Sequence, residues 1–353
     1  MVAIPTYLLA ASAASQIKSR SPEPAVESQD SAGFYGSVIG PVVGGNFPDP
    51  AVIYDAGTSY AYSTNSAGVH IPMASSQDNA SWSVMTGHDA LPSLGPWETD
   101  GQIWAPDVIR TDSGFVLYYA AATKASNGQY HCIGVATSED PTGPFAPQDQ
   151  PLICPDGPST GGAIDPDGFQ DSDGKRYIAY KLDGNANGNG GNCNNGIAPF
   201  QNTPIMLQEV DQDGVTLIGG PTQILDRDEA DGPLVEAPSL HRSDEGIYFL
   251  FFASNCFSSP QYATSYATAT SVGGPYTKAA RPLLVTGDGP DVYGPGGLDI
   301  MAGGNLVSFH GILGQSASPA RADVGGTQGP LVRGMYTGQM TFGGREVSFQ
   351  VSS

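Results

Sequence analysis

A weak internal repeat constrains the fold of this chain more than any other feature. Five times along the sequence, a segment that contains proline, and in four cases an acidic residue, precedes a hairpin of apolar and tyrosine-rich strands. The repeats begin about 50 to 75 residues apart, a spacing typical of β-propeller blades with loops added. The five opening segments are Phe47-Pro-Asp-Pro, Trp104-Ala-Pro-Asp, Ile164-Asp-Pro-Asp, Glu236-Ala-Pro-Ser and the more divergent Tyr293-Gly-Pro-Gly.

This repeat predicts an all-β chain, with a single five-bladed β-propeller over residues 33–353. Short runs of β-branched and aromatic residues alternate with turn residues, and no long stretch has the apolar period of a helix. The 47 Gly and 29 Pro residues suit many short strands joined by loops. Because innermost strands line the channel of a propeller, the opening segments should converge there. A β-sandwich or a β-helix is the alternative.

The charge of the chain argues against two classes of partner. Lys and Arg total 14 whereas Asp and Glu total 35, which gives a formal net charge of -21. Such a surface repels phosphate backbones and anionic lipid headgroups, so we expect no nucleic-acid and no membrane partner. We expect a monomer.

The N-terminus resembles a secretory leader. Residues 7–14 form a short apolar run that ends in small residues, although a positive segment before it is missing. We therefore predict a signal peptide over residues 1–15, a polar linker or propeptide over residues 16–32, and a secreted, extracellular protein. A disordered tail is the alternative.

The four cysteines fit a secreted chain. An even number of cysteines in an oxidising compartment favours disulfides, and four allow three pairings. Proximity in sequence favours Cys132 with Cys154 and Cys193 with Cys256. No CxxC pair is present, so a structural zinc is not expected.

Three acids stand in unusual sequence surroundings. Asp49 lies between two prolines, Asp165 precedes a proline, and Glu236 lies in Leu-Val-Glu-Ala-Pro. Two carboxyl groups whose environments push their pKa values apart can supply the acid and the base that hydrolysis of a glycosidic bond needs. Asp167 is the alternative to Asp165 as the functional acid of this segment, since an extended strand would put both side chains on one face. Asp107 is expected to be structural and to bond backbone amides of its own turn.

The order and spacing of these segments resemble glycoside hydrolase family 43. The resemblance rests on FPDP, WAPD, AIDPDGF, VEAPSL, a Gly-Pro-Gly segment and SFHG, and it covers about residues 45–311. It implies a five-bladed propeller that acts on arabinose- or xylose-containing polysaccharides with inversion at the anomeric carbon. It also implies roles for the trio: Asp49 as general base, Glu236 as general acid, and Asp165 as the pKa modulator that orients Glu236.

The resemblance also implies residues around the sugar. Trp104 would wall the sugar subsite, and Phe47, Phe169 and Tyr293 are further candidates for substrate binding. His310, in SFHG, matches a family histidine that in some relatives helps to hold a calcium or sodium ion near the axis. No cofactor is expected to be required, and such an ion would be structural.

One departure leaves the sugar open. Gly297 stands where relatives often have His after the Gly-Pro-Gly segment. The long polar loop over residues 183–200 can rim or cover a pocket, or it can be a decorative loop. We therefore expect an exo-acting α-L-arabinofuranosidase or β-xylosidase. The alternatives are an endo-1,5-α-L-arabinanase and, in another class, a carbohydrate-binding propeller without catalysis.

Overall fold

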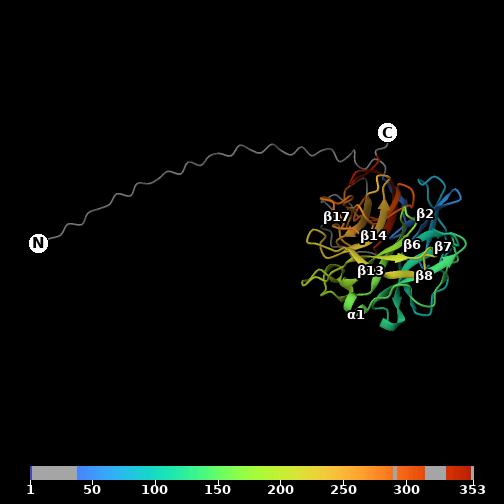
Figure 1. Ribbon diagram of the computed structural model, residues 1–353, viewed down its shortest axis with the longest axis horizontal. Coiled ribbons are helices and arrows are strands. Elements are labelled where there is room, and N and C mark those ends of the chain that lie inside the picture. The colour runs from blue at the N-terminus through green and yellow to red at the C-terminus, as the bar shows by residue number, and fades with distance from the viewer. Residues whose placement is uncertain (2–37, 289–291, 315–330, 351–353) are drawn as a thin grey trace. The chain divides into compact units, whose positions relative to one another are not determined.

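The computed structural model describes Met1 and residues 38–288, 292–314 and 331–350, and from residue 38 onward these form five antiparallel sheets (Figure 1). The prediction of an all-β, five-bladed β-propeller is confirmed. Apart from Met1, the predicted signal peptide and linker lie outside the described residues.

Four blades are meanders of four strands in sequence order. Blade 1 consists of β2 (Ala51–Asp55), β3 (Thr58–Tyr62), β4 (Met73–Ser76) and β5 (Ser83–Val84). Blade 2 consists of β6 (Glu98–Thr111), β7 (Gly114–Thr123), β8 (His131–Ser138) and β9 (Ala146–Pro147). Blade 3 consists of β10 (Ala163–Gln170), β11 (Arg176–Leu182), β12 (Ile205–Val210) and β13 (Leu217–Leu225). Blade 4 consists of β14 (Val235–Arg242), β15 (Tyr248–Ser254), β16 (Ala263–Ala269) and β17 (Thr277–Lys278).

The fifth blade joins the two ends of the described chain. Its strands are β18 (Gly296–Ile300), β19 (Leu306–Ile312), β20 (Arg333–Gly343), β1 (Ile39–Val43) and β21 (Glu346–Phe349). The early strand β1 pairs with the late strand β20, with Val43 opposite Met335. This pairing closes the ring, because the first blade then follows directly from a strand of the last one.

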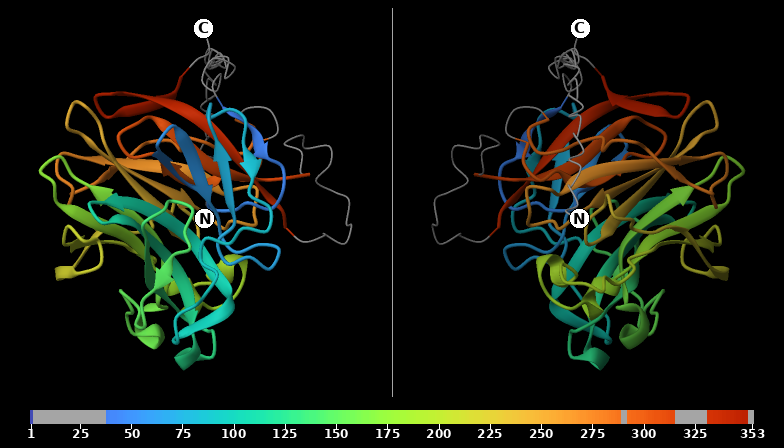
Figure 2. Two further views of the ribbon diagram at one scale, coloured as in Figure 1. Left: turned by 90° about the vertical axis from the view of Figure 1, so that its right-hand side faces the viewer. Right: turned by 90° about the vertical axis from the view of Figure 1, so that its left-hand side faces the viewer.

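The innermost strands surround the axis in sequence order. β2 contacts β6, β6 contacts β10, β10 contacts β14, β14 contacts β18, and β18 returns to β2. Figure 2 shows the colours following one another around the molecule from blue through green and yellow to red. Helical segments are short and lie in loops: α1 (Gly157–Thr160), η2 (Lys124–Ser126), η3 (Gly184–Asn187) and η4 (Asn192–Asn194). Among the described residues, no helix has the length and apolar character needed to cross a membrane.

The hydrophobic core is divided among the seams between blades. One buried cluster lies at each junction of neighbouring blades, and the cluster between blades 4 and 5 contains Phe249, Phe251 and Phe309. This arrangement follows from the alternation of side chains along each strand. Both faces of every blade pack against neighbouring blades, while polar residues gather in turns. The ring therefore holds the opening segments of all blades at one axis.

The predicted disulfides are confirmed. Cys132 is bonded to Cys154, and Cys193 is bonded to Cys256. The second bond ties the long loop of blade 3 to the loop that follows β15 in blade 4. A cross-link of this kind restrains both loops relative to each other.

Candidate active site at the propeller axis

All five blades have an uncommon backbone conformation at the axis. A residue with positive φ occurs at the same place in each inner strand or just before it, and a proline or leucine follows it. Side chains other than glycine rarely adopt this conformation, and such residues cluster at functional sites. The five residues and their φ angles are Asp49 (51°), Ala105 (42°), Asp165 (56°), Ala237 (49°) and Gly297 (56°).

A β-bulge accompanies this conformation in four blades. The pairing register shifts between Trp104 and Asp107, and it shifts in the same way at the equivalent positions of β10, β14 and β18. Bulges re-aim side chains next to active sites. In blade 5 the equivalent segment is Gly297-Leu298-Asp299, which directly follows the Tyr293-Gly-Pro-Gly segment that the sequence favoured.

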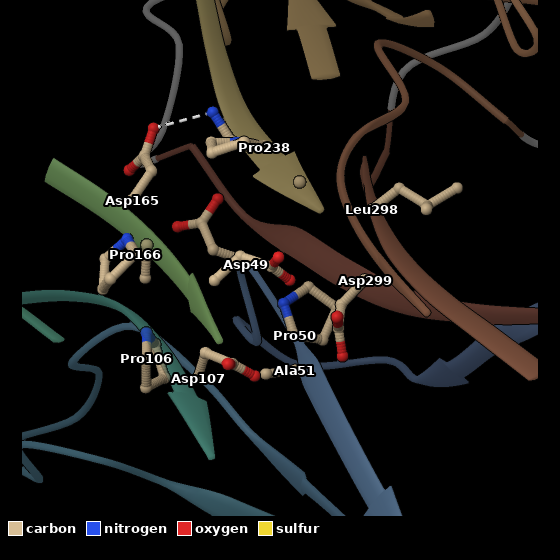
Figure 3. Close-up of a pocket in the computed structure, with 14 residues that line it drawn as sticks. Asp49, Pro50, Ala51, Pro106, Asp107, Asp165, Pro166, Pro238, Leu298 and Asp299 are labelled. Carbon is tan, nitrogen blue, oxygen red and sulfur yellow. Dashed lines mark hydrogen bonds between the residues drawn. The ribbon is translucent and has the colours of Figure 1, made fainter. Parts of the chain in front are cut away.

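These segments enclose a small cavity at the axis (Figure 3). Its volume is about 40 Å³, which accommodates water. Figure 3 shows the carboxyl groups of Asp49, Asp107, Asp165 and Asp299 gathered around this space.

Asp49 is held as a carboxylate. Its Oδ1 lies 3.1 Å from a guanidinium nitrogen of Arg333, and its Oδ2 accepts a hydrogen bond of 2.7 Å from Thr64. His310 lies 3.2 Å from Oδ1 through Nδ1. Burial alone would raise the pKa of Asp49, but Arg333, His310 and Thr64 together hold that pKa well below its usual range. Asp49 is therefore ionised at neutral and mildly acidic pH.

Gly297 makes room for this arrangement. A Cβ atom at this position would lie 2.8 Å from Nδ1 of His310 and 3.1 Å from Oδ1 of Asp49. The backbone also has positive φ there, so any side chain would meet both strain and a clash. The departure noted in the sequence thus creates space beside Asp49.

Glu236 lies across the axis with both carboxyl oxygens engaged. Its Oε2 accepts a hydrogen bond of 3.1 Å from Lys181, and its Oε1 accepts one of 2.9 Å from Tyr262. Lys181 is fully buried and also lies 3.0 Å from Oδ1 of Asp183. Burial would lower the pKa of Lys181, but the charges of Asp183 and Glu236 raise it above its usual value. Lys181 is therefore an ammonium ion.

Asp165 is the third acid that the structure brings to this place. Its Oδ2 accepts the backbone N–H of Ala237, the residue after Glu236, at 2.9 Å (Figure 3). Burial and the charge of Glu236 raise the pKa of Asp165 to about 8. The pKa of Asp165 is thus shifted upward, whereas that of Asp49 is shifted downward.

A second set of acids lies one step further along the inner strands. Asp107 accepts the N–H of Gly168 at 2.7 Å, and Asp167 accepts the N–H of Leu240 at 3.0 Å. Asp299 accepts the N–H of Val52 at 2.7 Å. Each acid thus bonds an inner strand of the next blade. The expectation that Asp107 bonds amides of its own turn is incomplete, since Gly168 belongs to blade 3.

Burial governs the ionisation of this second set. It raises the pKa of Asp107 to about 8, with a further contribution from the charge of Asp299. It raises the pKa of Asp299 to about 6, and it raises that of Asp167 well above its usual value. These carboxyls connect blades, and their bonds leave them little freedom for chemistry.

Two of the predicted substrate-binding residues lie elsewhere. Phe47 is 1% exposed and packs in the core between blades 1 and 5. Phe169 packs between blades 3 and 4, with its ring 6.3 Å from that of Tyr248. Both side chains pack among apolar residues at seams between blades, and their contact with substrate stays a prediction.

The other two candidates stay near the axis. Trp104 immediately precedes Ala105, is half-buried and stacks on His131 with ring centroids 3.8 Å apart. Tyr293 lies half-buried just before β18, where its carbonyl accepts the N–H of Ile312. Their contact with substrate stays a prediction.

Both ring nitrogens of His310 face protein groups. Its Nδ1 accepts the backbone N–H of Asp49 at 3.1 Å, and its Nε2 faces Arg333 at 3.5 Å. Burial and the charge of Arg333 lower the pKa of His310, which keeps the imidazole neutral. A role of His310 in holding an ion stays a prediction. No group of three or more His, Cys, Asp or Glu side chains within the described ranges could hold a metal ion.

The sequence did not single out three polar residues of the site. Arg333 begins β20, Lys181 lies in β11 and Tyr262 precedes β16. The signal for Lys181 was a lysine inside the apolar strand Arg-Tyr-Ile-Ala-Tyr-Lys-Leu. Arg333 and Tyr262 had no comparable signal, since they meet the acids only through packing of distant blades.

Comparison with known proteins places the chain among carbohydrate-cleaving propellers. Residues 39–319 match the model of glycosyl hydrolases family 43. The chain is 26% identical over 261 residues to an extracellular endo-α-(1->5)-L-arabinanase of Thermotoga petrophila, covering 65% of this chain and half of that protein. It is 27% identical over 274 residues to extracellular endo-α-(1->5)-L-arabinanase 1 of Bacillus subtilis, covering 73% of this chain and 78% of that protein.

Solved structures agree on the fold. The crystal structure of a thermostable family-43 glycoside hydrolase superposes with a TM-score of 0.70 and 24% identity, covering 88% of this chain and 95% of that one. A similarity at this level of identity concerns the fold. The overall fold is thus shared with a family-43 glycoside hydrolase.

Proposed function

The chain belongs to glycosyl hydrolases family 43, and from this membership we propose that it hydrolyses arabinose- or xylose-containing polysaccharides or oligosaccharides with inversion. The observation that carries the proposal is the division of labour among the three acids at the axis. Asp49 is held ionised by Arg333, whereas burial and the charge of the neighbouring Glu236 raise the pKa of Asp165 to about 8. This contrast supplies a base and an acid in one site.

The proposed reaction is a single displacement. Asp49 removes a proton from a water molecule while the water oxygen forms a bond to the anomeric carbon. The bond from that carbon to the glycosidic oxygen breaks, and Glu236 delivers a proton to the departing oxygen. Asp165 orients Glu236 through the N–H of Ala237. The transition state resembles an oxocarbenium ion, with positive charge near the anomeric carbon. The carboxylate of Asp49 stabilises this charge.

Exo action is the finer part of the proposal. The Cys193–Cys256 disulfide anchors the long loop of blade 3, and Phe257 next to it is 38% exposed. Phe257 lies in the loop that follows β15, and the guanidinium of Arg333 packs on its ring at 5.0 Å, so this second loop reaches the surroundings of Asp49. Two cross-linked loops, one of which reaches the site, support removal of terminal arabinofuranosyl or xylosyl units. The similarity to two endo-α-(1->5)-L-arabinanases supports endo-1,5-α-L-arabinanase as the second candidate.

We propose that the protein acts outside the cell. Two disulfides suit an oxidising compartment, and both arabinanase relatives are named as extracellular.

A substrate panel with product analysis tests the function. We expect release of 4-nitrophenol from the α-L-arabinofuranoside or the β-D-xyloside, and monosaccharide as the first product from linear arabinan or xylan. Early products of several sugar units would favour the endo alternative, and binding without hydrolysis would favour a binding protein. Proton NMR of the first product should detect the inverted anomer, and retention would contradict the mechanism.

A further inference from the structure

A buried lysine contacts the proposed acid, and the chemistry above does not use it. Lys181 is 0% exposed, and its ammonium group lies between Oδ1 of Asp183 at 3.0 Å and Oε2 of Glu236 at 3.1 Å. An unpaired ammonium is very costly to bury, so its two partners are needed to keep it there. In the sheet, Lys181 pairs with Ile164, which precedes Asp165. The lysine therefore lies beside both acids of this side.

The opposite oxygen of Glu236 is fixed as well. Tyr262 donates to Oε1 at 2.9 Å, and its ring packs so closely on Gly296 that a Cβ there would lie 1.9 Å from it. The same ring stacks on His310 with centroids 5.8 Å apart. Lys181 and Tyr262 thus clamp Glu236 from two sides, in the orientation that the inner strand gives it.

The contact with Lys181 conflicts with the proposed role of Glu236 as a proton donor. A general acid has to carry a proton, but an ammonium group 3.1 Å away favours the carboxylate. Asp183 on the other side of Lys181 offsets part of that positive charge. The balance between Lys181 and Asp183 therefore bears directly on whether Glu236 can donate.

We propose that Lys181 is a positioning residue for Glu236, and that the Lys181–Asp183 pair sets the pH above which Glu236 stops donating its proton. The proposal rests on the proposed function. It adds that a residue in the second strand of blade 3, Lys181, controls the protonation of the acid Glu236 in blade 4.

Other groups around the pair fit this role. Asp165 and Tyr262 face Glu236. Burial, the largest cause in each case, raises both of their pKa values, and Tyr262 is uncharged at neutral pH. His131 faces Asp183 from blade 2, and burial lowers its pKa to about 4, so it too is neutral. On the far side of the site, Arg333 and Asp49 offset each other. Lys181 and Asp183 are thus the charges that act on Glu236 most directly.

The test compares pH profiles of kcat/KM for two substrates. One is an unactivated disaccharide, whose leaving group needs a proton, and the other is a 4-nitrophenyl glycoside, whose leaving group does not. Removal of the ammonium in Lys181→Met should move the alkaline limb for the disaccharide to higher pH by about 1 to 3 units. Removal of the opposing acid in Asp183→Asn should move the same limb to lower pH. Both limbs for the 4-nitrophenyl substrate should move much less.

Two further variants separate this role from a structural one. Lys181→Arg keeps the charge and should restore the limb of the wild type. Lys175→Met removes an exposed lysine that precedes the same strand and pairs with Glu209 at 3.3 Å, and it should leave both profiles unchanged. If Lys181→Met does not fold, the downward shift in Asp183→Asn still decides the question, because a structural role predicts lost protein and no shift.

Glu236→Gln assayed on the same substrates distinguishes the possible failures. A fully active Glu236→Gln overturns the proposed function and this inference together. An inactive Glu236→Gln, with unmoved limbs in Lys181→Met and Asp183→Asn, overturns this inference alone.

Discussion

Asp165 and Asp167 lie two residues apart in one strand, yet their surroundings differ. Asp165 is half-buried, lies beside Glu236 and accepts the N–H of Ala237. Asp167 is 6% exposed and accepts the N–H of Leu240 in the next blade. A regular strand would point both side chains to one face, but the bulge and the positive φ of Asp165 turn them apart. Backbone geometry, more than residue type, therefore separates the acids proposed to react from those that connect blades.

The same division runs around the ring. The first position of the repeated segment supplies Asp49 and Asp165 to the site, and the third position supplies acids that connect blades. In blade 4 this third position is Ser239, whose hydroxyl accepts the N–H of Ile300 at 3.3 Å. In blade 1 it is Ala51, which has no polar side chain. One repeat thus carries both the chemistry and the closure of the propeller.

The largest expected effect concerns the three acids proposed to react, Asp49, Asp165 and Glu236. Glu236→Gln removes the proton donor but keeps the shape and one hydrogen-bond acceptor. Its kcat/KM for an unactivated disaccharide should fall by about 10² to 10⁴-fold, with a much smaller loss for a 4-nitrophenyl glycoside. Steady-state kinetics of the two substrates measure this, and equal losses for both would contradict the role of Glu236.

The next effect concerns the second set. Asp167→Ala leaves the N–H of Leu240 buried without its acceptor, which should lower the free energy of unfolding by about 1 to 3 kcal/mol. The kcat/KM of the remaining folded protein should change only a few-fold. Urea unfolding measures the loss, and Asp112→Ala, in an exposed turn, is the matched control. A loss of activity without a loss of stability would break the division between the two sets.

The sequence predicted the blades and the acids of the opening segments, but it did not predict the contacts between blades. Proline and acid recur in the opening segments, so the blades, the axis and the trio of acids followed from local patterns. Phe47 and Phe169 pack among apolar residues between blades, and no local pattern distinguishes this placement from a position at a sugar subsite. The fifth segment was misplaced because Leu298 occupies the place of the proline, which hid Asp299.

Contacts between blades account for the remaining gaps. Lys181 and Arg333 reach Glu236 and Asp49 from the second and third strands of other sheets, over separations of 55 and 284 residues. No local pattern records which residue of a distant strand will face an acid. The folded ring is needed to bring these charges together.

A smaller effect is a dependence of stability on pH. Asp299 and Asp107 have folded-state pKa values raised to about 6 and about 8 by burial, above the value of about 3.9 in an unfolded chain. The folded state therefore binds extra protons, and the stability they contribute is complete below about pH 4 and lost as the pH rises toward 8. The melting temperature should fall over this range. Asp107→Asn, which stays neutral, should flatten the decline, and an unchanged slope would argue against buried neutral carboxyls.

The smallest expected effect sharpens the contrast between Asp49 and Asp165. Arg333 contributes to the low pKa of Asp49, so Arg333→Met should raise it and move the acid limb of kcat/KM to higher pH by about 1 to 3 units. The alkaline limb should stay in place, since Glu236 lies with Lys181 instead. A pH profile from about pH 3 to 9 measures both limbs, and movement of the alkaline limb alone would contradict the assignment.

The most direct measurement compares kcat/KM, per folded molecule, for Asp165→Asn and Asp167→Asn on one unactivated substrate. Both substitutions replace a carboxyl with an amide of the same shape, in the same strand, two residues apart. We predict a loss of about 10²-fold or more for Asp165→Asn and a value within a few-fold of wild type for Asp167→Asn. Equal losses, or a larger loss for Asp167→Asn, would contradict the division of one repeat into reactive and structural acids.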